Sequence, residues 1–155
     1  MGKSSRGAHG LELNHSLWYI TELMRNNPRD TLLAVHRRHA KAWEQRNLDE
    51  LRRIYSENAV IFSTEPPPRF ADFKTFENTL QQYFSQIAEV SFFTSNIQIE
   101  VFDNIAWINS QYLRAHRLNG QMIRQSGRWT EVYQKEADDW KLVHLHSSLD
   151  PEVGD

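Results

Sequence analysis

The spacing of apolar residues changes from a helical period to a strand period part-way along the chain. In the first half, apolar side chains recur every three or four positions, which predicts amphipathic helices. The last of these segments carries mainly aromatic rings on its apolar side, so we expect it to pack against a broad surface. Asp30 and Asp72 are the expected N-caps of the second and fourth helices. The predicted helices are residues 13–24, 30–46, 48–55 and 72–87.

From Val90 onward apolar and polar residues alternate, which predicts long strands joined by tight turns. The Asn119-Gly120 pair is typical of a two-residue hairpin, because both central positions of that turn need positive φ. A short strand at 59–62 and a proline-rich loop precede the fourth helix. The predicted long strands are residues 90–102, 105–118, 121–134 and 140–148.

This order of elements predicts an α+β fold. Long antiparallel strands coil strongly, so we expect a cone in which a curved, mostly antiparallel sheet wraps around three helices. Residues 28–150 would form that domain. Residues 11–27 would add an extra N-terminal helix, and residues 1–10, which are polar and small, would form a disordered tail.

The composition argues against several classes of function. The net charge of -2 gives no field that would attract nucleic acid or an anionic membrane. The lack of cysteine excludes disulfides and thiol chemistry, and no apolar run approaches the roughly 20 residues of a membrane span. We therefore expect a cytoplasmic protein without a nucleic-acid or membrane partner. The basic residues between Arg37 and Arg53 indicate a solvated helix face.

Three stretches of the sequence resemble one superfamily. Residues 42–49 (AWEQRNLD) look like its helix break, and residues 55–60 (YSENAV) look like the start of its first strand. Residues 129–133 (WTEVY) followed by 140–148 (WKLVHLHSS) look like its last hairpin. The chain thus resembles the SnoaL-like domains of the nuclear-transport-factor-2-like superfamily, and the hairpin is especially similar to the association domain of calcium/calmodulin-dependent protein kinase II. This resemblance implies a cone fold that dimerises through its outer sheet face, but the superfamily hosts many unrelated functions.

Strand alternation, together with this resemblance, predicts which side chains face the interior of the cone. If Leu145 faces inward, so does Ser147, and by analogy with the family hairpin so do Trp129 and Glu131. A face that mixes large aromatic rings with a few polar groups is typical of a binding pocket. We expect a pocket for a small, largely apolar molecule. Its expected lining is Trp43, Tyr55, Ser63, Trp107, Asn109, Gln111, Trp129 and Ser147.

Two classes of function stay open for this pocket. One is a non-catalytic binding or assembly domain. The other is an enzyme of isomerase, dehydratase or cyclase type, in which His39 and Glu131 would form an acid–base pair without a cofactor. The ketosteroid isomerase pattern implied by the superfamily is not kept, because its base falls at Ser63 and its tyrosine near His39.

The opposite face of the last strand is the expected dimer contact. Simple alternation places four residues on it, with Arg114 and Arg128 also directed away from the interior. We expect no metal site there, because no carboxylate lies at ligand spacing from the two histidines. The expected contact residues are Trp140, Leu142, His144 and His146.

Overall fold

The first two helices of the domain begin at well-formed caps. The computed structural model describes residues 17, 27–64 and 66–151. Helix α2 spans Pro28–Glu44, and the Asn27 side chain accepts a hydrogen bond from the Arg29 amide at 3.0 Å. The helix therefore starts two residues before the predicted cap, because proline at the first position has no amide proton to leave unpaired. Helix α3, Leu48–Ile54, is capped by Asn47.

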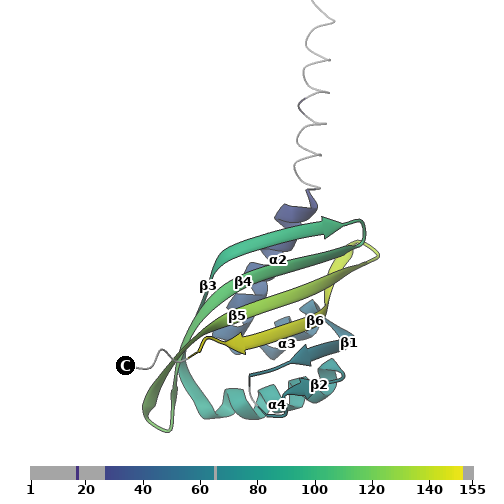
Figure 1. Ribbon diagram of the computed structural model, residues 1–155. Coiled ribbons are helices and arrows are strands. Elements are labelled where there is room, and N and C mark those ends of the chain that lie inside the picture. Colours follow the sequence, from purple (N-terminus) through teal and green to yellow (C-terminus); the bar gives the residue numbers. More distant parts are fainter. Residues whose placement is uncertain (1–16, 18–26, 65, 152–155) are drawn as a thin grey trace, which may run out of the picture.

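Helix α4 buries the aromatic stripe that the sequence predicts. It spans Phe73–Gln86, and Asp72 caps it by accepting from the Thr75 amide at 2.7 Å. Its buried residues include Phe73, Phe76, Leu80 and Phe84. Figure 1 shows α2, α3 and α4 gathered on one side of a curved sheet, which is the predicted α+β arrangement.

The sheet has six strands in the order β2-β1-β6-β5-β4-β3. Neighbours pair antiparallel except β1 with β6, which pair parallel, so the sheet is mixed. At the hairpin between β4 and β5, Asn119 and Gly120 have φ of 50° and 80°, as the two-residue turn requires. The strands are β1 Tyr55–Phe62, β2 Arg69–Phe70, β3 Ile87–Phe102, β4 Ile105–Leu118, β5 Gln121–Glu136 and β6 Asp139–Leu149.

A bulge in β6 overturns part of the predicted dimer surface. Tyr133 pairs with Leu142, but the preceding residue of β5, Val132, pairs with His144, so Val143 is an extra residue. The extra residue reverses the alternation. Trp140 and Leu142 consequently point inward and are 7% and 0% exposed. His144 and His146 stay on the outer face, where both rings meet Phe62 edge-on.

The facing of β4 is also the reverse of the prediction. Directly paired residues of neighbouring strands share a face, and Ile108 pairs with the inward residue Glu131. Trp107, Asn109 and Gln111 therefore lie on the outer face, with Gln111 Oε1 accepting from the Asn96 side-chain carboxamide. The two-residue turn sets this register, because it places Leu118 opposite Gln121 and each odd-numbered residue of β4 opposite an even-numbered residue of β5.

The predicted tail and most of the predicted N-terminal helix lie outside the described residues. Leu17 is helical and exposed, and Asn27 is the cap of α2. No helix in the described part of the chain is long and apolar enough to cross a membrane.

Candidate functional site

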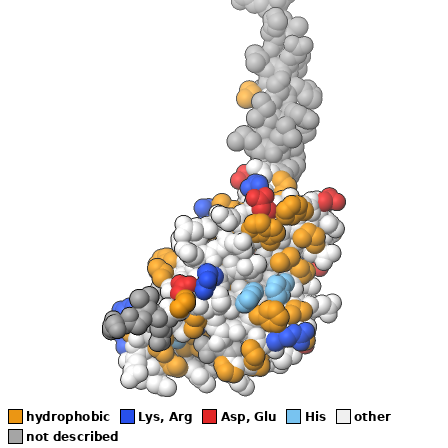
Figure 2. Space-filling model, in the orientation of Figure 1, with side chains coloured by type: hydrophobic (Ala, Val, Ile, Leu, Met, Phe, Trp, Pro, Cys, Tyr) orange, Lys and Arg blue, Asp and Glu red, His pale blue; other side chains and the backbone are white. Residues whose placement is uncertain are grey.

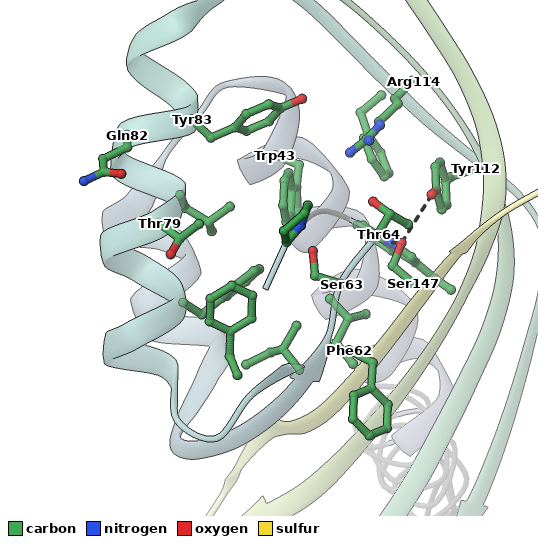
Figure 3. Close-up of a pocket in the computed structure, with 18 of the residues that line it drawn as sticks. Trp43, Phe62, Ser63, Thr64, Thr79, Gln82, Tyr83, Tyr112, Arg114 and Ser147 are labelled. Carbon is green, nitrogen blue, oxygen red and sulfur yellow. Dashed lines mark hydrogen bonds between the residues drawn. The ribbon is translucent and has the colours of Figure 1, made fainter. Parts of the chain in front are cut away.

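A cavity of about 260 Å³ opens between helix α4, the end of β1 and the inner faces of β4, β5 and β6. Most of its wall is apolar, and Figure 3 shows polar side chains entering it from both the helix and the sheet. The apolar lining includes Trp43, Ile61, Phe70, Phe76, Leu80, Phe92, Trp129 and Leu145. The polar lining includes Ser63, Thr64, Thr79, Gln82, Tyr83, Gln86, Tyr112, Arg114 and Ser147.

Half of the predicted pocket residues line this cavity. Trp43, Ser63, Trp129 and Ser147 do so. Tyr55 faces inward but lies deeper, 3% exposed, and is not part of the lining. The three β4 residues of the prediction are on the outer face, as described above.

One wall of the cavity is tied together across three strands. The Trp129 indole N–H donates to Ser147 Oγ at 3.2 Å, and Ser147 Oγ in turn donates to Tyr112 Oη at 3.2 Å. Figure 3 shows the second of these bonds. The Phe92 ring lies 4.7 Å from the Trp129 ring and completes the wall. The shape of this side of the cavity is therefore fixed by hydrogen bonds as well as by packing.

The sequence prediction missed a polar group at the α4 side. Tyr83 lines the cavity, and its Oη lies 3.1 Å from Nε2 of His116, which is 4% exposed. Arg114 also lines the cavity instead of facing away, and its Nε donates to Gln125 Oε1 at 2.6 Å. With the β4 register known, the sequence itself indicates these polar groups, since Tyr112, Arg114 and His116 are alternate residues of one strand and share its inner face.

Beneath the cavity lies a fully buried carboxylate, Glu131. His36 Nδ1 is 2.5 Å from one of its oxygens and His39 Nδ1 is 2.6 Å from the other. Tyr133 donates to the second oxygen at 2.8 Å. All three side chains that bind Glu131 are 0% exposed. The predicted pairing of His39 with Glu131 is thus present, and His36 is a partner that the prediction lacked.

The contacts of His39 fix where its proton lies. The Trp43 indole N–H can only donate, and it points at His39 Nε2 at 3.2 Å. Nε2 is therefore an acceptor, and the ring proton is on Nδ1, where it donates to Glu131. Tyr55 Oη is 2.9 Å from the same Nε2. The imidazole thus lies between the Trp43 indole, the Tyr55 hydroxyl and the Glu131 carboxylate.

A buried carboxylate needs a compensating positive charge. His36 is the ring that can carry it, because its second nitrogen faces Thr94 Oγ1 at 3.0 Å and a hydroxyl can accept a hydrogen bond. Burial alone would raise the pKa of Glu131, but the hydrogen bonds from His36 and His39 outweigh burial and lower that pKa to about 2. Burial, and then the Glu131 charge, raise the pKa of Tyr55 and Tyr133 well above 10.

Neither His39 nor Glu131 lines the cavity. Trp129 stacks on the His39 ring with centroids 4.7 Å apart, and Trp43 donates to its outward nitrogen. These two indoles line the cavity and lie between it and the buried network. The network thus supports the cavity wall without contacting the cavity itself.

Comparison with known proteins agrees with this architecture. The model of the SnoaL-like domain matches residues 32–151. The chain belongs to the SnoaL-like domain family. No curated protein matches this SnoaL-like chain.

Solved structures share the fold of this SnoaL-like domain at low sequence identity. A Novosphingobium aromaticivorans protein described as a candidate scytalone dehydratase has a TM-score of 0.73 and 18% identity, covering 86% of this chain and 89% of its own. A Xanthomonas campestris protein described as a candidate calcium/calmodulin-dependent protein kinase II association domain has a TM-score of 0.71 and 20% identity. The match covers 83% of this chain and 92% of that protein. A nuclear-transport-factor-2-like protein from Pseudomonas putida has a TM-score of 0.68 and 14% identity. The match covers 79% of this chain and 86% of that protein.

The chemistry available in this SnoaL-like cavity is limited. Among its described lining residues the titratable groups are Tyr83, Tyr112 and Arg114, without a carboxylate or an imidazole. The described residues also contain no cluster of three or more histidine, cysteine, aspartate or glutamate side chains that could hold a metal ion. The described lining consists mainly of apolar side chains with a few hydrogen-bonding groups.

Proposed function

We propose that this SnoaL-like domain binds a small, largely apolar molecule in the cavity. The observation that carries the proposal is the cavity itself, about 260 Å³ with aromatic walls and a few hydrogen-bonding groups. Ligand sites have this character and usually measure about 300–1,000 Å³. A molecule of up to three rings suits a cavity just below that range. The wall formed by Trp129, Tyr112 and Ser147 would hold one side of such a ring system.

A neutral fluorescent probe tests this proposal. N-phenyl-1-naphthylamine gains fluorescence in apolar sites, and we expect it to bind the wild-type protein. Thr79→Trp would fill the cavity from α4 and should weaken binding at least tenfold, whereas Asn78→Trp, exposed on the same helix, should leave it unchanged. No probe binding, or equal binding by both variants, would contradict the proposal.

The outer sheet face is the proposed homodimer contact. Phe93 and Leu113 pair across β3 and β4 and are 62% and 61% exposed. Figure 2 shows imidazole side chains beside hydrophobic ones on this face, and His144 and His146 lie there with Phe62. Large apolar side chains in such a patch usually mark an interface.

Light scattering after size exclusion tests the dimer. The wild-type protein should have twice the monomer mass, and His146→Glu should give monomers. Asn78→Glu on α4, away from the sheet, should remain dimeric. A monomeric wild-type protein, or a His146→Glu dimer of unchanged stability on dilution, would count against this surface.

Tyr83 and His116 favour proton transfer as a second candidate function. With the His116 proton on Nδ1, its Nε2 can accept the Tyr83 proton while Tyr83 Oη takes a proton from a carbon next to a ligand carbonyl. The products would be a ligand enolate and a His116 imidazolium, and reversal would return a proton to carbon. Arg114, which also lines the cavity, would offset the enolate charge.

Deuterium incorporation distinguishes this enzyme from a binding domain. Small cyclic ketones in deuterium oxide should exchange their α-hydrogens faster with the wild-type protein than with Tyr83→Phe. Asn78→Ala, which is exposed on the same helix and keeps the Tyr83–His116 bond, is the control and should exchange at the wild-type rate. If all three proteins leave the exchange at the buffer rate, the proton-transfer candidate is wrong and the binding proposal is unaffected.

A further inference from the structure

Two tryptophans of the cavity wall are held by one buried imidazole. Trp43 donates its indole N–H to His39 Nε2 at 3.2 Å, and Trp129 stacks on the same ring at 4.7 Å with the planes 21° apart. Both indoles line the cavity. Any rotation of the His39 ring would therefore move a hydrogen-bond partner of one tryptophan and the stacking surface of the other.

His39 is itself prevented from rotating. Its Nδ1 donates to Glu131 on β5 at 2.6 Å, and its Nε2 meets Tyr55 of β1 at 2.9 Å. Glu131 is fixed in turn, because its oxygens also form hydrogen bonds with His36 and Tyr133. The contacts come from α2, β1 and β5, and a ring flip would break those on both nitrogens at once. The imidazole is locked in one orientation and one tautomer.

We propose that Glu131 and His39 are positioning residues that orient Trp43 and Trp129 and so determine which ligand shapes the cavity accepts. This inference rests on the proposed binding function. Glu131 fixes the His39 tautomer, and that tautomer presents a lone pair to the Trp43 indole. The Trp43 ring in turn lies within 5.5 Å of Phe84 and 6.2 Å of Phe76, measured between centroids. A change at the buried carboxylate would therefore be felt at the cavity wall.

The rival explanation is that His39 only stabilises the fold. Two substitutions of His39 distinguish this structural role from the positioning role. In His39→Asn the carboxamide reaches the position of Nδ1 and can still donate to Glu131, but the acceptor for Trp43 is lost. In His39→Gln the carboxamide reaches the position of Nε2 and can still accept from Trp43, but the donor to Glu131 is lost. Both variants remove the ring that stacks on Trp129.

The two variants should rank oppositely in binding and in stability. We expect His39→Gln to bind N-phenyl-1-naphthylamine within about threefold of the wild-type affinity, and His39→Asn to bind at least tenfold more weakly. His39→Asn should nevertheless be the more stable to urea, because it keeps the bond to the buried carboxylate. If affinity instead follows stability in these variants, the positioning role is wrong.

A third variant covers the case in which either His39 variant fails to fold. Trp43→Phe removes the indole N–H at a half-buried position and leaves His39 and Glu131 in place. We expect it to weaken probe binding about tenfold and to reduce the near-ultraviolet circular dichroism of the protein, because one of its immobilised indoles is lost; unchanged binding would overturn the inference. Failure of the wild-type protein to bind the probe, or equal binding by Thr79→Trp and Asn78→Trp, would instead contradict the proposed function. In that case the near-ultraviolet circular dichroism of the two His39 variants tests the positioning of Trp43 without the probe: we expect a weaker indole signal in His39→Asn than in His39→Gln, and equal signals would overturn the inference.

Discussion

Trp129 stacks on His39 with ring centroids 4.7 Å apart and planes inclined by 21°. Stacking at this distance excludes a ligand atom between the two rings. The indole therefore separates the buried histidine from the cavity, and the acid–base pair that the sequence suggests becomes part of the support of the site. Glu131 is buried and does not line the cavity, so we propose an electrostatic role for it inside the core.

Replacing Glu131 with glutamine should destabilise the protein strongly. The amide would face two ring nitrogens with only one acceptor oxygen, and the buried histidines would lose the carboxylate that pairs with them. We expect a loss of about 3–5 kcal/mol in the free energy of unfolding, measured in urea at pH 7. Glu57→Gln, at an exposed position of β1, should change it by less than about 0.5 kcal/mol. A loss below about 1 kcal/mol for Glu131→Gln would contradict the ionic network.

The stability of the wild-type protein should fall in acid over a defined range. The pKa of Glu131 is about 2 in the folded protein against an ordinary value of 4.5, so the unfolded chain binds the proton more readily. The stabilisation is complete above pH 4.5 and is lost as the pH falls from there towards 2. A shift of this size corresponds to roughly 3 kcal/mol.

Other carboxylates contribute to the same acid slope, so the comparison must be with Glu131→Gln. Asp72, for example, has a lowered pKa because it accepts from the Thr75 amide. Unfolding free energies measured from pH 7 to 3 should fall more steeply in the wild-type protein than in the variant. Parallel curves would show that Glu131 is not ionised in the folded state.

The bulge at Val143 predicts that substitutions at two residues of one strand lower the free energy of unfolding by very different amounts. Leu142 is 0% exposed beside Tyr133, and Leu142→Ala should cost about 2–5 kcal/mol in unfolding free energy. His144→Ala removes a bond to the Val60 carbonyl on the outer face and should cost about 1 kcal/mol or less. Thermal denaturation of both variants checks the facing, and similar losses would contradict the bulge.

Gly127 should not tolerate a side chain. A Cβ at this position would lie 2.2 Å from the Ser148 carbonyl oxygen and 2.4 Å from Tyr112 Oη. Gly127→Ala should therefore destabilise the protein by about 1–3 kcal/mol and displace Tyr112 from the cavity wall, weakening probe binding. Ser126→Ala is the neighbouring control and should leave both measurements near wild type. A fully stable Gly127→Ala protein would exclude the close approach of β5 and β6.

The sequence by itself determined the elements whose signals are local. Helical spacing predicted the aromatic side of α4, and Asp72 marked its start. Alternation predicted the long strands, and Asn119-Gly120 predicted their hairpin. Each of these signals acts between residues a few positions apart, where backbone geometry and burial of one face decide the outcome.

Only the tertiary structure decided which side chains meet. One extra residue at Val143 turns Trp140 and Leu142 into the core, and alternation alone does not reveal a bulge. Glu131 is joined to His39 across 92 residues and to His36 across 95, and Tyr83 meets His116 across 33. Such contacts depend on how the sheet curves around α2 and α4. The identity of the residues shows that they can pair, but their burial beneath Trp43 and Trp129 follows from packing of the whole domain.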